Sequence, residues 1–271
     1  MDFQGAELYS KYNHTFVVCA YGKSPYLIDC VESLLNQSIK SNVIISTSTP
    51  NDLIASVADR YDLPLFINEG AAGIAHDWNC AVNHCSTELI TIAHQDDVYS
   101  GSYVESMLER VNQSRKPLIF FTDYEELRDG SVCSSSLLLN IKRILLFPLK
   151  SKQLSSKKFV KRLSLSFGSS ICCPSVTLVL PNLKTPIFKE GFKSNLDWEA
   201  WEHISQLDGD FCYCSEKLTK HRIHSESETS ALIKDNTRTT EDYLMLRKFW
   251  PDKIARLINV LYSRGQNSNT L

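Results

Sequence analysis

Long hydrophobic runs are absent from this sequence. No stretch of about 18 consecutive apolar residues occurs, so we expect no membrane-spanning helix. The N-terminal segment lacks a basic start followed by an apolar stretch, and we therefore expect no secretory signal. The formal net charge of −2 shows no excess of either sign, which gives no reason to expect nucleic acid as a partner.

A disulfide framework is not expected either, although the chain contains nine cysteines. The number is odd, and most of them lie inside apolar runs, where a thiol packs as a small hydrophobic group. Cys212 and Cys214 alternate onto one face of a strand, and no second Cys/His pair stands at zinc spacing, which favours packing over metal binding. We therefore expect a reducing, cytoplasmic location.

A regular alternation of strand and helix patterns fills the first 124 residues. Apolar strand-like runs occur at residues 14–21, 43–45, 65–67, 89–94 and 118–122. Between them, apolar side chains recur at helical spacing, and we expect Ser24 to cap the first helix and Asn51 or Asp52 the second. Such alternation is typical of a mostly parallel sheet covered by helices.

The pattern changes after Asp123. Asp129-Gly130 indicates a hairpin turn, residues 171–177 and 218–224 indicate strands, and a helix begins near residue 195. Residues 140–165 are rich in lysine and arginine and contain no acidic residue. We expect two amphipathic helices there, whose basic faces are either solvated or in contact with anionic lipid headgroups or a pyrophosphate-linked acceptor.

Two adjacent carboxylates, Asp96 and Asp97, end the apolar run that begins at Leu89. Ligands of open α/β sheets bind just beyond the carboxyl ends of such strands. Neighbouring carboxylates repel each other unless a cation lies between them, and Mg²⁺ or Mn²⁺ takes one or two carboxylates together with substrate phosphates. The segment therefore indicates a metal-assisted reaction on a phosphorylated substrate. The alternative is a solvated turn that caps the next helix.

Five segments, taken in order, resemble motifs of the family 2 glycosyltransferases of GT-A fold. They are residues 20–24 with the helix end at 33–37, the helix 73–81 that contains Asn79, the strand end Gln95-Asp96-Asp97, the acidic segment 196–199, and residues 221–224. The similarity covers residues 14–125 and 190–230. It implies a GT-A fold: a Rossmann-like α/β domain with a mostly parallel sheet flanked by helices and a helical acceptor-side and C-terminal region.

The same resemblance implies how the chain is organised. Residues 1–125 would form the half that binds the nucleotide sugar. Residues 126–235 would form the acceptor-binding and catalytic-base half of the same domain, with a basic helical insertion at about 136–166. Residues 236–271 would form C-terminal helices and a tail.

The resemblance also implies a metal-dependent, inverting transfer from a UDP- or dTDP-sugar to an acceptor hydroxyl, in the biosynthesis of a surface polysaccharide or lipopolysaccharide. Asp97 would bind Mn²⁺ or Mg²⁺ directly, and Asp96 would share the metal or hold the ribose hydroxyls. His224 is a further candidate metal ligand, and Arg222 is a candidate clamp for the diphosphate. If residues 221–224 form a strand, His221 and His224 should lie on opposite faces of it.

Asp197 is the candidate catalytic base, and Glu199 is its competitor. A helix N-terminus favours an ionised carboxylate at this position. Residues two apart on a helix point in different directions, so only one of the two acids can face the site. The alternative for Asp197 is an ordinary helix cap that follows Asn195.

By the same resemblance, the nucleotide would contact Ala20 and Tyr21 after the first strand and Thr47 and Ser48 after the second. Asp77 and Asn79, in the helix expected at 73–81, would add polar contacts. The sequence departs from the family at two places. Ser46-Thr47-Ser48-Thr49 replaces an acidic pair, and Trp78 replaces an arginine.

Two other functions compete with glycosyl transfer. A nucleotidyltransferase could use the same carboxylates, but it needs a Gly-rich phosphate loop, and Gly22-Lys23-Ser24-Pro25 has one glycine. A non-catalytic sugar-nucleotide-binding protein would lack the base. The favoured partners are a nucleotide-sugar donor and a glycan or lipid-linked glycan acceptor, with peripheral membrane contact through residues 140–165 at the inner face of the membrane.

Overall fold

The computed structural model describes residues 9–224 and 237–267. Its strands are β1 (His14–Ala20), β2 (Asn42–Thr47), β3 (Leu65–Ile67), β4 (Leu89–His94), β5 (Val98–Tyr99), β6 (Pro117–Arg128), β7 (Ser131–Cys133), β8 (Val176–Val179) and β9 (Asp210–Ile223). Its helices are α1 (Leu27–Leu35), α2 (Asp52–Arg60), α3 (Ile74–His84), α4 (Tyr103–Asn112), α5 (Leu137–Leu146), α6 (Lys158–Ser164), α7 (Leu196–Ser205), α9 (Thr237–Arg247) and α10 (Asp252–Asn267).

All of these strands belong to one mixed sheet in the order β3-β2-β1-β4-β8-β6-β9-β5, with β7 paired to β6. β1 is parallel to β2 and β4, β2 to β3, and β6 to β9, whereas β8 runs antiparallel to both β4 and β6. The expected α/β fold is confirmed. β6 runs through residue 125, so the two expected halves share a single sheet.

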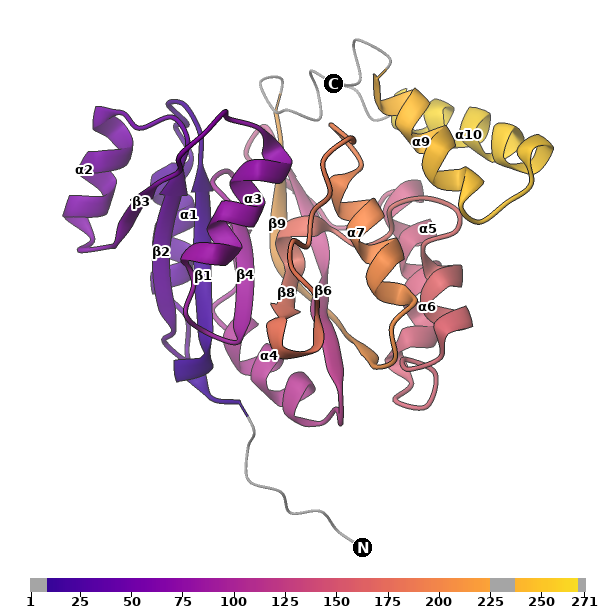
Figure 1. The fold of residues 1–271 in the computed structure, drawn as a ribbon, viewed down its shortest axis with the longest axis horizontal. Coiled ribbons are helices and arrows are strands. Elements are labelled where there is room, and N and C mark those ends of the chain that lie inside the picture. The colour runs from indigo at the N-terminus through magenta and orange to yellow at the C-terminus, as the bar shows by residue number, and fades with distance from the viewer. Residues whose placement is uncertain (1–8, 225–236, 268–271) are drawn as a thin grey trace, which may run out of the picture.

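Helices cover both faces of the sheet (Figure 1). Alternate residues of β1 point to opposite faces, so that Val17 joins the core beneath α3 and α7, and Phe16 and Val18 join the core beneath α1, α2 and α4. Because both faces are buried, the central strands β1 and β4 are apolar along most of their length.

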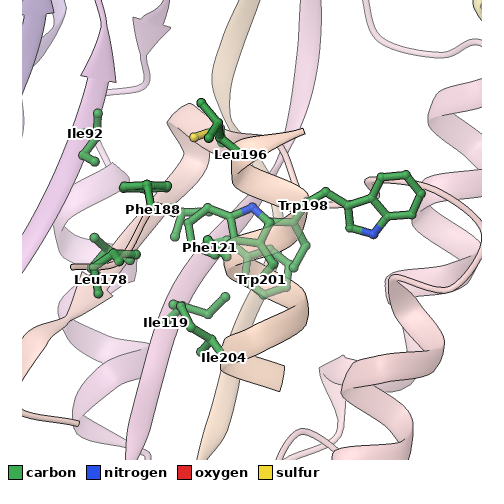
Figure 2. Packing of buried hydrophobic residues seen from close by; sticks show 14 of the residues in the cluster. Ile92, Ile119, Phe121, Leu178, Phe188, Leu196, Trp198, Trp201 and Ile204 are labelled. Carbon is green, nitrogen blue, oxygen red and sulfur yellow. The ribbon is translucent and has the colours of Figure 1, made fainter. Parts of the chain in front are cut away.

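The helix that carries the candidate base is held by aromatic packing (Figure 2). Trp198 and Trp201 on α7 are fully buried, and the Trp201 ring packs edge-on against Phe188, with their ring centres 6.2 Å apart. The Trp198 indole donates a hydrogen bond to the Leu165 carbonyl at 2.9 Å. These contacts fix the rotation of α7, and therefore the direction in which its first residues point.

Several local predictions are confirmed. Asn51 caps α2, since its side-chain oxygen accepts hydrogen bonds from the backbone of Leu53 and Ile54. Asp129 and Gly130 form the two-residue turn between β6 and β7, with positive φ at both positions, as a type I′ turn requires. Cys212 and Cys214 pack on one face of β9 in the same core cluster.

Other local predictions are wrong. Ser24 does not cap α1, which begins after Tyr26; its hydroxyl instead donates to Asp96. The strand expected at 171–177 begins only at Val176, because Pro174 lies in a short 3-10 helix. Lys161 is not on a solvated basic face: its side chain is buried, and its ammonium donates to the carbonyls of Leu207 and Gly209, at 2.7 Å each.

Residues 140–165 do contain two helices, the greater part of α5 and the whole of α6. Within the part of the chain that the structure describes, every helix is too short or too polar to cross a membrane.

Candidate active site

A cavity of about 520 Å³ opens at the carboxyl ends of β1, β2 and β4. It brings together many of the residues singled out in the sequence: Ala20, Tyr21, Thr47, Asp77, Asp96, Asp97, Asp197 and Arg222. Ser48, Asn79, Glu199 and His224 are not among the residues that line it. The sheet edge predicted from the apolar run at 89–94 is therefore the place where these distant segments meet.

Asp97 is enclosed at the base of this cavity, with only 1% of its side chain exposed. Its carboxylate accepts a hydrogen bond from the backbone N–H of Arg222 at 2.7 Å, and the Nδ1 atom of His221 lies 3.1 Å away. Burial alone would raise the pKa of Asp97, but His221, with help from His94 and the Arg222 N–H, lowers it. Burial would likewise lower the pKa of His221, but Asp97 raises it. The two side chains thus favour each other's charged form, with Asp97 buried and His221 partly exposed.

Asp96 is more accessible, with 24% of its side chain exposed. Ser24 Oγ donates to its Oδ1 at 2.6 Å, and His224 Nε2 lies 3.2 Å from its Oδ2. Both imidazoles of the closing segment therefore reach the acidic pair, and the expectation of opposite faces, which assumed a strand through residue 224, does not apply. β9 ends at Ile223, so the strand alternation does not extend to His224.

Arg222 lies between the acidic pair and α1. Its Nε donates to the Asp96 carbonyl at 2.8 Å, its guanidinium lies 4.1 Å from the centre of the Tyr26 ring, and it pairs with Asp29 at 3.3 Å. These contacts hold a cation at the lining of the cavity, beside Asp96.

The donor atoms of the acidic pair suit a hard divalent cation. Among residues 9–224 and 237–267, no group of three or more His, Cys, Asp or Glu side chains is arranged to hold a metal by itself. Mg²⁺ seldom has such a cage, since it takes one or two carboxylates and fills its shell with water and substrate phosphates. The buried His94 Nε2 has no hydrogen-bond partner and belongs to a residue that lines the same cavity. The residues therefore fit a metal that binds together with a diphosphate.

Asp197 reaches the cavity from the first turn of α7. Its Oδ1 accepts the Trp198 N–H at 2.7 Å, and Ser169 Oγ lies 3.5 Å from its Oδ2. Burial raises the pKa of Asp197, although Trp198, Arg238, Lys142 and Ser169 each favour its ionised form. A carboxylate with a raised pKa and no ion pair among the described side chains is suited to accept a proton.

Glu199 points away from the cavity. It is buried against Lys189 at 3.2 Å and Lys248 at 3.0 Å, and although burial raises its pKa, these two lysines lower it overall. Of the two acids on α7, only Asp197 lines the cavity, as the spacing of two residues requires.

The residues expected to contact the nucleotide divide into two groups. Ala20, Tyr21, Thr47 and Asp77 line the cavity, whereas Ser48 bonds to the Asp77 carboxylate and so holds it in place. The position of Asn79 differs from the expectation: its amide exchanges two hydrogen bonds with the backbone of Phe188, at 2.7 and 3.1 Å. The amide is therefore engaged in joining α3 to the segment before α7.

Trp78, which replaces the arginine usual in the family, does line the cavity. Its ring stacks on the His94 imidazole at 5.2 Å and packs edge-on against Phe188 at 4.9 Å. A flat aromatic face in this position offers an apolar wall beside the acidic pair.

Sequence reasoning missed three cations and a serine that line the cavity: Lys142, Lys193, Arg238 and Ser169. Lys142 stood in the basic segment and was expected at the surface, but its ammonium donates to the Tyr124 hydroxyl at 2.9 Å. Arg238 gave no signal in the sequence, because α9 reaches the cavity only through the tertiary fold.

Comparison with known proteins agrees with this arrangement. The chain matches the model of the glycosyl transferase family 2 over residues 15–161, which is more than half of its length. Glycosyltransferase GlyG of Streptococcus pneumoniae serotype 4 is 24% identical over 123 residues, covering 42% of this chain and 40% of that protein. Glycosyltransferase GlyA of the same organism is 24% identical over 102 residues, covering 36% of this chain and 15% of that protein. The chain thus spans less than half of the length of either relative.

Solved structures share the fold. S. aureus TarS 1-349 in complex with UDP-GlcNAc superposes with a TM-score of 0.61 at 14% identity, covering 91% of this chain and 70% of that one. The complex of the same protein with UDP gives a TM-score of 0.59 at 13% identity, covering 91% and 69%.

Proposed function

Since the chain belongs to glycosyl transferase family 2, we propose that it moves a sugar from a UDP-sugar to an acceptor hydroxyl with inversion at the sugar carbon. One observation carries the proposal: an acidic pair and a separate carboxylate with a raised pKa line the same cavity. The crystallised complexes of TarS with UDP-GlcNAc and UDP support the choice of donor.

The acidic pair serves the leaving group. Asp96 and Asp97 would hold Mn²⁺ or Mg²⁺, which when bound neutralises the charge that develops on the departing diphosphate. Arg222 adds a fixed guanidinium beside Asp96, and His224 holds the Asp96 carboxylate in place. The ion pair with His221 keeps Asp97 ionised.

Asp197 serves the acceptor. In an inverting displacement the acceptor oxygen attacks the sugar carbon from the face opposite the leaving group and must lose its proton. Asp197 would accept that proton, because it lines the cavity on a helix that Trp198 and Trp201 hold rigidly. Trp78 and the ends of β1 and β2 would enclose the nucleoside.

The acceptor we infer is a glycan or lipid-linked glycan of a surface polysaccharide or lipopolysaccharide pathway, reached from the cytoplasmic side of a membrane. The support is the basic segment 140–165, which exposes Phe147 and Phe159 next to Lys150 and Lys157. An exposed apolar and basic surface of this kind suits an anionic bilayer.

The decisive experiment is incubation of the protein with UDP-GlcNAc and Mn²⁺, with release of UDP as the product measured. Release of pyrophosphate instead would indicate the nucleotidyltransferase, and binding without any product would indicate a sugar-nucleotide-binding protein.

We expect Asp97→Asn to abolish metal-dependent UDP binding, and Asp197→Asn to retain UDP binding and lose transfer. Unchanged UDP affinity in Asp97→Asn would contradict the site assignment.

A further inference from the structure

Among the residues that the structure describes, one guanidinium of the cavity wall has neither a hydrogen-bond nor an ion-pair partner. Arg238, on the first turn of α9, lines the cavity, and its Nε is buried without a hydrogen-bond partner. The described residues offer it neither a hydrogen bond nor an ion pair within 4.0 Å. A buried N–H on a charged group is costly to leave unpaired, so a bound anion is a partner that suits the position of Arg238.

The location of Arg238 decides which substrate supplies that anion. Arg238 favours the ionised form of Asp197, and Lys142 does the same, so both cations lie near the candidate base. Neither is close enough to form an ion pair with Asp197. The acidic pair has its own cation in Arg222, which is held by Asp29 and the Asp96 carbonyl.

The donor diphosphate and the base must lie on opposite sides of the sugar carbon in an inverting reaction. A cation beside the base is therefore on the side from which the acceptor approaches. Lys193, in the segment that leads into α7, also lines the cavity. Two cations, Arg238 and Lys142, thus act on the Asp197 carboxylate, and a third, Lys193, lines the same cavity.

We propose that Arg238 binds a phosphate group of the acceptor, and that the enzyme selects acceptors in which a phosphate lies next to the hydroxyl that receives the sugar. A guanidinium suits this task because its planar N–H groups bind two phosphate oxygens at once. This inference rests on the proposed function. It adds a property that the matched family segment, residues 15–161, does not include, since Arg238 lies beyond it.

The test is binding of glycerol 1-phosphate, with glycerol as the uncharged control, to the full chain saturated with UDP and Mn²⁺. UDP fills the donor site, so a second anion must bind elsewhere. We expect calorimetry to detect glycerol 1-phosphate but not glycerol. Arg238→Gln should weaken this binding about tenfold or more, Arg238→Lys should weaken it less, and Arg247→Gln, an exposed arginine on the same helix, should leave it unchanged.

Three results would overturn the inference. They are no binding of glycerol 1-phosphate by the UDP-saturated wild type, equal binding by wild type and Arg238→Gln, and a loss of UDP affinity in Arg238→Gln, which would place Arg238 at the donor diphosphate. Failure of the proposed function looks different: the wild type itself would neither bind UDP nor release it from UDP-GlcNAc. Arg238→Lys retains the charge and checks that a defect of Arg238→Gln is not a folding defect.

Discussion

Asp97 and Asp197 show how one cavity gives two aspartates different properties. Asp97 has the His221 imidazole and a backbone N–H beside its carboxylate, so its pKa falls in spite of burial. Asp197 is buried with weaker compensation, so its pKa rises. A pair of acids whose surroundings push their pKa values apart divides naturally into a fixed anion and a proton acceptor.

The first prediction concerns the acid limb of the pH–rate profile. Activity needs ionised Asp197, so kcat/KM should fall as pH drops through its raised pKa, above the ordinary aspartate value of 3.8. Ser169→Ala removes a hydrogen bond that favours the ionised form, so the limb should move to higher pH. The measurement is kcat/KM against pH for both proteins, and a limb that moves to lower pH in Ser169→Ala would refute the role of Asp197.

Asp197→Asn supplies the control for that assignment. Transfer should fall by about 10²–10⁴-fold, the usual contribution of a general base. A folded-state pKa that is raised means that the native protein loses stability as pH rises through it, because ionisation is then penalised. The asparagine variant should therefore be no less stable than the wild type at pH 7 in a thermal melt, which separates lost chemistry from lost folding.

At the scale of elements, α9 holds the start of α7. The Glu241 carboxylate accepts hydrogen bonds from the backbone N–H groups of Lys193, Ser194 and Asn195, at 2.7, 2.8 and 3.0 Å. The neighbouring Asp242 accepts from the Asn195 amide at 2.8 Å. The segment that leads into the base is thus fixed by acids that lie more than forty residues further along the chain.

The second prediction follows from that contact. Glu241→Gln should destabilise the protein by about 1–3 kcal/mol, since a buried charged acceptor is replaced by a weaker neutral one. It should also lower kcat with little change in UDP affinity, because α7 carries the base and not the nucleotide contacts. Glu190→Gln, an exposed acid before α7, is the control and should change neither. A selective loss of UDP affinity in Glu241→Gln would show that α7 is not what Glu241 positions.

Local patterns predicted the elements well and their distant contacts poorly. Apolar periodicity located β1, β2 and β4 and their helices because burial on both faces leaves that pattern in the sequence. The basic pattern at 140–165 misplaced Lys161, since only the tertiary fold supplies the carbonyls of Leu207 and Gly209 that its ammonium needs. Burial lowers the pKa of Lys161 to about 8, which no neighbour in the sequence would indicate.

The residues of the candidate site could likewise be predicted where a local pattern marks them, but not where only distant contacts do. Asp96, Asp97 and Asp197 could be selected because each stands at the end or start of an element with a strong local pattern. Arg238 and Glu241 could not, because the cavity wall that Arg238 joins and the backbone N–H groups that Glu241 binds belong to other parts of the chain. Asn79 was selected by resemblance alone, and its amide bonds with Phe188 are contacts of tertiary structure.

On the scale of the whole molecule, different elements lie at the two ends of the sheet. α2 and β3 lie at one end in Figure 1, and α5 and α6 lie at the other, next to the side of the cavity that carries Lys142. α5 and the turn after it expose Ile144 and Phe147 with 71% and 66% of their surface accessible, and α6 exposes Phe159 with 75%. Lys150 and Lys157 are exposed beside them.

The third prediction is that this surface binds anionic membranes. Burial of the aromatic rings and attraction of each lysine, worth about 1 kcal/mol near a charged bilayer, act together. We expect wild type to co-sediment with vesicles of anionic lipid and less with neutral ones, and Lys150→Glu/Lys157→Glu and Phe147→Ser/Phe159→Ser each to reduce that binding severalfold. UDP affinity should not change, since none of the four residues lines the cavity.

Tyr12→Ser, which removes an exposed aromatic ring outside α5 and α6, is the matched control and should bind like wild type. Equal sedimentation of wild type and both double variants would show that α5 and α6 face water and that the acceptor reaches Asp197 by another route.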